Sequence, residues 1–108
     1  MDLAAKKCVP CEGDMSPLTR DEAEKLLKDI PLWMLWPDAS TISRSLKFKN
    51  FKDAFACATQ IAALAEEEGH HPDLLMSWGR VEIELSTHAI RGLSENDFIL
   101  AAKIDKIT

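Results

Sequence analysis

Residues 69–88 read GHHPDLLMSWGRVEIELSTH, and this stretch decides the fold. From Val81 to Leu85 apolar and acidic side chains alternate, which is the pattern of a strand with one buried face. Asp73–Trp78 is typical of a second strand, and Gly79-Arg80 lies between the two as a tight turn. The stretch therefore predicts a β-hairpin that follows directly on a pair of adjacent histidines.

A long helix is predicted before the hairpin. Apolar residues recur at helical spacing from Phe51 to about Glu68, with Asn50 as a candidate cap and Gly69 as the glycine that ends the helix. Further upstream, apolar and polar side chains alternate from Thr41 to Lys49, which predicts a half-buried strand. Arg44 falls on the apolar face of that strand, so we expect it at the sheet margin or paired.

Capping patterns mark the two remaining helices. Residues 19–22, Thr-Arg-Asp-Glu, form a capping box that begins one helix, which Pro31 ends. Residues 94–97, Ser-Glu-Asn-Asp, form a similar box, and the last helix runs from there through Ile104. With a short apolar run at Trp33–Trp36, the order is α-β-β-α-β-β-α. This order predicts an α+β fold, a four-stranded antiparallel sheet with three helices packed on one face.

Length and composition limit the classes of protein that fit this chain. Its 108 residues are enough for one domain. We place that domain at residues 18–108, after an N-terminal arm at residues 1–17 that we expect to be extended or loosely docked. The net charge of −5 argues against direct binding to nucleic acid, because phosphate contacts need clustered Lys and Arg. No apolar run approaches the length of about 18 residues that a membrane span needs.

The three cysteines favour a reducing compartment. Their number is odd and the N-terminus lacks the pattern of a secretory signal, so we expect a cytoplasmic protein and leave an organelle location open. Cys8 and Cys11 form a lone C-x-x-C, without the second pair of a zinc site or the flanking strand and helix of a redox motif. The role of these two cysteines is therefore left open.

All three histidines flank the hairpin, at positions His70, His71 and His88. Because the two strands run out and back, we expect the histidines to meet at one end of the sheet, beside the start of the last helix. Imidazole changes its charge near pH 7, so such a cluster can move protons in both directions. Glu66 and Asp97 are expected nearby, where a carboxylate could hold one imidazole in a fixed tautomer.

Each of these residues also has a structural explanation. A histidine pair at a helix end is commonly surface or capping material, and Asp97 is equally well explained as the capping carboxylate of the last helix. Glu66 begins a run of three glutamates that fits a solvated helix end, with one of the three able to turn inward to a histidine. Three clustered imidazoles could also bind zinc, although adjacent histidines chelate one ion awkwardly.

The spacing of these residues resembles that of one known family, the pterin-4a-carbinolamine dehydratases, also called 4a-hydroxytetrahydrobiopterin dehydratases. The resemblance rests on Glu66-x-x-x-His70-His71-Pro72, then the hairpin, then Ser86-Thr87-His88 and Gly92-Leu93-Ser94-Glu95-x-Asp97. It covers about residues 18–105. Upstream residues at the family's usual spacings are Trp33, Ile42, Arg44, Phe48, Phe51 and Ala54.

The resemblance implies an activity and a set of site residues. The reaction would be the dehydration of 4a-hydroxytetrahydrobiopterin to quinonoid dihydrobiopterin, without a metal or an organic cofactor. The family's catalytic residues fall on His70, His71, His88 and Asp97. We expect contacts with the pterin from Glu66, Pro72, Ser86 and Thr87. Within this set we expect His70 and His88 to be the acid and base, and His71 to bind or orient the pterin.

The same resemblance implies partners. The product would return to the pterin pool that aromatic amino-acid hydroxylases use. Because the family assembles through the sheet edge and helices, we expect a homodimer or a homotetramer. The alternative hypothesis is an oligomeric protein-binding module or dimerisation cofactor without catalysis. Animal members of the family also act as dimerisation cofactors for a homeodomain transcription factor, an activity that we do not carry over to this chain. The sequence contains no recognisable motif for that second activity.

Overall fold

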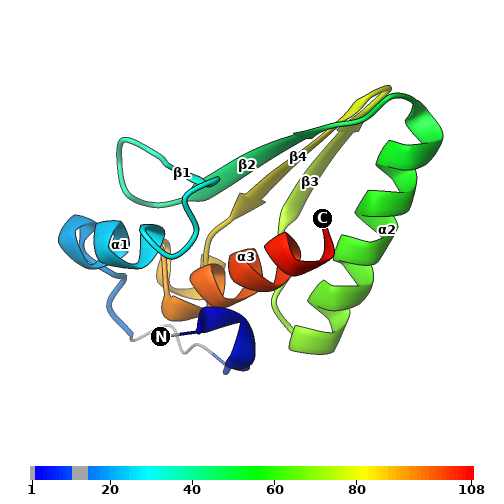
Figure 1. Cartoon of the computed structure of the whole chain (residues 1–108). Helices are drawn as coiled ribbons and strands as arrows, with labels where there is room; N and C mark the ends of the chain where they lie inside the picture. The colour runs from blue at the N-terminus through cyan, green and yellow to red at the C-terminus, as the bar shows by residue number, and fades with distance from the viewer. Residues whose placement is uncertain (1, 11–14) are drawn as a thin grey trace.

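One antiparallel sheet carries the three helices on a single face (Figure 1). The structure is a computed structural model, which describes residues 2–10 and 15–108. Its helices are α1 (Arg20–Leu27), α2 (Phe51–Glu68) and α3 (Glu95–Ile107), and its strands are β1 (Met34–Leu35), β2 (Ile42–Lys47), β3 (Asp73–Ser77) and β4 (Arg80–Leu85). Two 3₁₀ turns are η1 (Leu3–Ala5) and η2 (His88–Ile90). The strand order β1-β2-β4-β3 and the order of the elements confirm the predicted α+β fold.

The core lies between the sheet and α3. The side chains with no exposed surface include Ile42, Val81, Ile83 and Leu85 from the sheet and Phe98, Leu100 and Ile104 from α3. Burial of each such side chain contributes about 1.5–3 kcal/mol relative to leaving it in water. The alternation predicted for β2 and β4 is therefore present, with every second side chain directed at the helices.

The predicted capping residues begin α1 and α2, whereas α1 ends at Leu27, before the predicted end at Pro31. The Glu22 amide donates to Thr19 Oγ1 at 3.2 Å to begin α1, and the Asp53 amide donates to Asn50 Oδ1 at 2.7 Å to begin α2. Gly69 ends α2 with a φ of +66°, a left-handed conformation that costs other residues free energy. None of the helices in the described ranges is long and apolar enough to cross a bilayer.

Arg44 is paired, as its position on the apolar face of β2 predicted. Its guanidinium bonds to the carboxylate of Asp105 on α3 and donates to Thr108 Oγ1 at 3.1 Å. The indole of Trp33 donates to the same carboxylate at 2.9 Å. The Arg44 side chain is only 14% exposed. Its charge is tolerated in the sheet because the Asp105 carboxylate pairs with it.

The hairpin turn is one residue earlier than predicted. Trp78 and Gly79 form it, and Arg80 belongs to β4, where it pairs with Ser77 of β3. At this turn the Phe48 amide after β2 donates to the Gly79 carbonyl at 2.8 Å, a contact between residues distant in sequence. Between β4 and α3 the chain also forms a 3₁₀ turn, η2, which is too short to leave a periodic pattern in the sequence.

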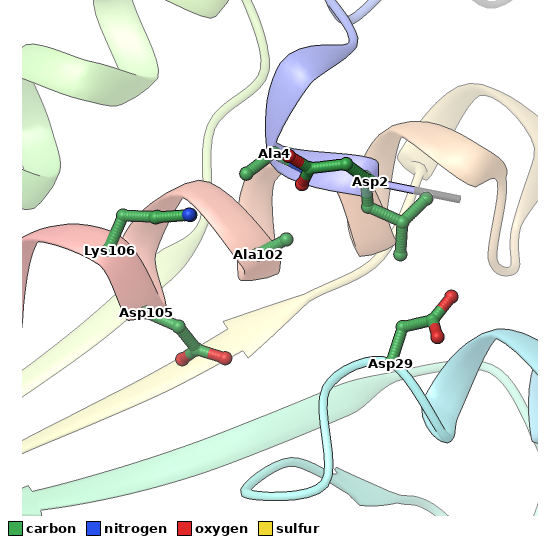
Figure 2. A pocket seen from close by; sticks show the side chains of 7 residues that line it. Asp2, Ala4, Asp29, Ala102, Asp105 and Lys106 are labelled. Atoms are coloured by element: carbon green, nitrogen blue, oxygen red, sulfur yellow. The ribbon is translucent and has the colours of Figure 1, made fainter.

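The first residues pack more closely than the sequence indicated. Leu3 in η1 is 2% exposed and belongs to the hydrophobic core. Figure 2 shows Asp2 and Ala4 of this segment beside Ala102 and Lys106 of α3, at the rim of a hollow of about 370 Å³. A single leucine in a short turn gives no periodicity from which this docking could be read. The division into an arm at residues 1–17 and a domain at residues 18–108 stays a prediction.

The loop after β4 is held against the segment before α1. The Leu18 amide donates to the Leu93 carbonyl at 2.8 Å. A Cβ atom at Gly92 would lie 2.7 Å from Pro17 Cβ, which is closer than two carbon atoms can pack. Only glycine fits at this position, and the loop therefore keeps a fixed path between η2 and α3.

Candidate active site

The three histidines line one hollow at the end of the sheet. It has a volume of about 320 Å³, at the lower end of the range for small-molecule sites. Its lining combines the segment after α2 with the segment after β4: Gly69, His70, His71, Pro72, Asp73, Ser86, Thr87, His88 and Ala89. The hairpin thus brings together residues that are distant in sequence, as expected from two strands that run out and back.

His70 is bonded to a buried carboxylate. Its Nε2 atom lies 2.6 Å from Oδ1 of Asp97 in the first turn of α3. The Asp97 side chain has no exposed surface, and the His70 side chain is 12% exposed. An ionised carboxylate only accepts hydrogen bonds, so Nε2 carries a hydrogen and Nδ1 is the ring nitrogen left for other chemistry.

The second oxygen of Asp97 is also fully used. Oδ2 accepts from Thr87 Oγ1 at 2.8 Å and from the Ser94 amide at 3.0 Å. The Thr87 and Ser94 hydroxyls lie 2.7 Å apart, which closes a small buried network. Asp97 therefore caps the N-terminus of α3 and also binds the His70 ring. The capping role and the contact with a histidine, both expected from the sequence, occur together.

His71 and Glu66 form an exposed pair. His71 Nε2 bonds to Glu66 Oε2, and the two side chains are 60% and 77% exposed. One of the three glutamates at the end of α2 thus contacts a histidine, but it does so at the surface and does not turn inward. Pro72 follows and leads directly into β3. Of the other two glutamates, Glu68 turns to the N-terminal segment instead.

His88 is the first residue of η2 and its side chain is exposed. Thr87 lies just before it and also lines the hollow. Its N–H donates to the Gly92 carbonyl at 2.8 Å, and its C=O accepts from Ile90 and Gly92. These backbone groups are engaged inside the protein, and its side chain supports Asp97. Ser86 lines the hollow, as does Asp73, whose place after the His-His-Pro run was the only sequence signal for it.

The arrangement suits proton transfer. The imidazole of His70, before the hairpin, is bonded to the buried carboxylate of Asp97. The imidazole of His88, after the hairpin, is exposed to water. Within residues 2–10 and 15–108, no three His, Cys, Asp or Glu side chains are grouped so that they could hold a metal ion. Cys8 and Cys57 are free thiols, and Cys11 lies outside the described residues.

Comparison with known proteins identifies close relatives. A family model described as pterin 4 alpha carbinolamine dehydratase matches residues 16–107. A protein of Methylococcus capsulatus is 49% identical over 105 residues, which cover 97% of this chain and 92% of the relative. A protein of Halorhodospira halophila is 48% identical over 107 residues, covering 99% and 98%. Both relatives are named pterin-4-alpha-carbinolamine dehydratase, as a provisional assignment.

Two solved structures share the fold. One is a transcriptional coactivator/pterin dehydratase from Brucella melitensis, with 35% identity and a TM-score of 0.79 over 85% of this chain and 98% of that one. The other is a pterin dehydratase-like protein described as a RuBisCO assembly factor in the alpha-carboxysome, with 25% identity and a TM-score of 0.60 over 69% and 87%. The sequence matches and the shared fold agree, and the chain belongs to the pterin-4-alpha-carbinolamine dehydratase family.

Proposed function

We propose that this protein removes water from 4a-hydroxytetrahydrobiopterin to give quinonoid dihydrobiopterin. The observation that carries the proposal is the His70–Asp97 pair at the edge of a hollow that His71 and His88 also line. Membership of the family supplies the substrate class, and the arrangement of the imidazoles supplies the chemistry.

The reaction needs two proton transfers and no change of oxidation state. The bond between C4a and its hydroxyl breaks, the N–H bond at the neighbouring ring nitrogen breaks, and a C=N double bond forms between the two atoms. The departing hydroxyl needs one proton to leave as water, and the ring nitrogen gives one up. An acid and a base near neutral pH therefore suffice, and histidine can be either.

We assign the base to His70 and the acid to His88. When His70 accepts the proton from the ring nitrogen, the carboxylate of Asp97 stabilises the imidazolium that forms, as in Ser-His-Asp triads. His88 is exposed, so it can give a proton to the hydroxyl and regain one from water. His71 lines the hollow, and its contact with Glu66 outside the lining holds a ring that can orient the pterin.

Binding of the pterin would use the remaining polar groups of the hollow. Ser86 and Pro72 line it on the two sides of the hairpin. We expect the backbone around Ser86 to meet the amide edge of the pterin. In a cell the enzyme would act in the cytoplasm beside an aromatic amino-acid hydroxylase, which forms the hydroxylated pterin that this reaction consumes.

The protein is proposed to work as a homodimer or a homotetramer. On α2, Phe51 and Phe55 are 51% and 57% exposed, and their stacked rings have centroids 6.4 Å apart. β3 lies at an edge of the sheet with one side unpaired in the strand order. The same surfaces favour the alternative function, docking of another protein without catalysis.

The oligomeric state is measurable by light scattering. We expect a mass of two or four chains of 12.1 kDa, and a smaller mass after Phe55→Glu, because a charge on α2 opposes burial of that face. A single-chain mass at micromolar concentration would contradict the assembly.

A double substitution tests the activity. The purified protein should accelerate the decay of freshly formed 4a-hydroxytetrahydropterin, followed by absorbance. His70→Gln combined with His88→Ala should lose nearly all of this acceleration, since each acid or base group contributes about 10²–10⁴-fold. Glutamine keeps a donor for Asp97, so the circular dichroism spectrum should stay unchanged. Acceleration that survives in the folded variant would overturn the assignment, and an inactive wild type would favour the docking function.

Single substitutions test the division of roles. A base must be neutral and an acid protonated, so the rate of the wild type should fall at both low and high pH. In His70→Gln the fall at low pH should disappear from the residual rate, and in His88→Gln the fall at high pH should disappear. Rates of each variant across the pH range give the result. If the two losses are exchanged, His88 is the base.

A further inference from the structure

Residues 6–9, named here the N-terminal strap, cross from the end of α2 to the start of α3. The Cys8 amide donates to Oε1 of Glu68, the last residue of α2, at 3.0 Å. The Val9 amide donates to Oδ1 of Asn96 at 2.9 Å. Lys6 Nζ lies 2.8 Å from Oε1 of Glu95. The strap therefore joins two helix ends that have no covalent connection near this point.

Asn96 binds the strap with both ends of its side-chain amide. Besides accepting from the Val9 amide, its Nδ2 donates to the Val9 carbonyl. The residue is 4% exposed, so its bonds to the strap lie away from water. Because buried hydrogen bonds are costly to break, loss of the strap would weaken the placement of Asn96.

Glu68 depends on the strap for a different reason. Its side chain is 3% exposed and stands at the C-terminal end of a helix, where the helix dipole disfavours a negative charge. The Cys8 amide, and then Lys103 at 3.4 Å, hold the pKa of this carboxyl below its ordinary 4.5. A lowered pKa stabilises the fold at pH values above 4.5, and this stabilisation is lost as the pH falls through the lowered value.

The Cys8 thiol reports whether the strap is in place. Burial, and then the nearby Glu68 carboxylate, raise the pKa of the thiol to about 12. Its Sγ atom lies 3.6 Å from the Asn96 carbonyl. At neutral pH the docked thiol stays protonated and reacts slowly with alkylating reagents, because the thiolate is the reactive form.

Both anchors of the strap adjoin the residues of the His70–Asp97 pair. Glu68 is separated from His70 only by Gly69, whose left-handed conformation fixes the turn, and Asn96 directly precedes Asp97. We propose that the strap holds these two segments at the separation that the His70–Asp97 hydrogen bond needs. Glu68 and Asn96 are then positioning residues, and the inference rests on the proposed function for the importance of the pair.

This role lies outside the part of the chain that defines the family. The family model begins at residue 16, after the strap. Inside the matched part, the Glu68–Lys103 ion pair also joins α2 to α3, but it reaches the middle of α3 and not its first turn. Misplacement of a catalytic group by about 1 Å can lower a rate by about a hundredfold, so a clamp at this position has a direct effect on the site.

The experiment compares Asn96→Ala with Asn50→Ala in the full chain. Asn50 forms the same kind of bond, side-chain oxygen to backbone amide, but at the opposite end of α2. Three measurements are made. The first is alkylation of Cys8 by iodoacetamide, located by tandem mass spectrometry. The second is hydrogen exchange of the His70 Nε2–H, observed as a low-field proton resonance with ¹⁵N-labelled histidine, and the third is the steady-state kinetics of dehydration, which gives kcat and KM.

In Asn96→Ala we expect Cys8 to be alkylated faster and the His70 Nε2–H to exchange about tenfold faster. A tenfold change in exchange rate corresponds to the loss of one or two net hydrogen bonds. The kcat of this variant should fall while KM changes by less than about twofold, because the substrate contacts remain. Asn50→Ala should lower the melting temperature and leave the results of all three measurements unchanged. Faster alkylation with unchanged His70 exchange and unchanged kcat would overturn the proposal, since the strap would then be undocked without effect on the site.

Glu68 gives an independent test if Asn96→Ala does not fold. Glu68→Ala should reproduce the faster exchange at His70, and Glu68→Gln should restore slow exchange, because the glutamine oxygen still accepts from the Cys8 amide. Equal exchange in both variants would contradict the role of this anchor. The exchange measurement needs no substrate. An inactive wild type would therefore refute the proposed function, while exchange of the His70 Nε2–H alone decides the positioning role.

Discussion

The carboxylate of Asp97 is completely buried and accepts hydrogen bonds from three separate segments. A carboxylate without partners in such a place costs several kcal/mol, so the three donors have to be present together. They come from Thr87 after β4, from the Ser94 amide at the start of α3, and from His70 after α2. The same carboxylate therefore takes part both in the start of α3 and in the candidate site.

The rest of the structure serves to bring these segments to one place. The hairpin of β3 and β4 sets the distance between the two histidine segments, and Gly69 turns the chain from α2 into His70. The fixed path of the loop at Gly92 leads into α3, and the N-terminal strap joins the ends of α2 and α3. Proton transfer needs imidazoles at set positions, and a small α+β domain provides them through short connections.

The parts of the fold that depend on neighbouring residues were predictable from the sequence. The alternation of Val81–Leu85, the capping residues Thr19 and Asn50 and the glycine after α2 are local signals, and the structure has each of them. The docking of residues 6–9 was not predictable, because Val9 and Asn96 are 87 positions apart and neither is a defining residue of the pattern in which it lies. The side-chain role of Thr87 was missed for a similar reason: it depends on how η2 returns the chain to α3.

Asp97→Asn tests the central claim most directly, because it keeps the size of the side chain and removes its charge. The three donors contact both oxygens of the Asp97 carboxylate, and an amide has only one oxygen that accepts. An amide also stabilises an imidazolium less than a carboxylate does. The measurement is kcat for dehydration in the folded variant. The account predicts a fall of about 10²–10⁴-fold, the contribution of an acid or base group. A kcat within about threefold of the wild type would contradict it, since the His70–Asp97 pair would then have no part in the rate.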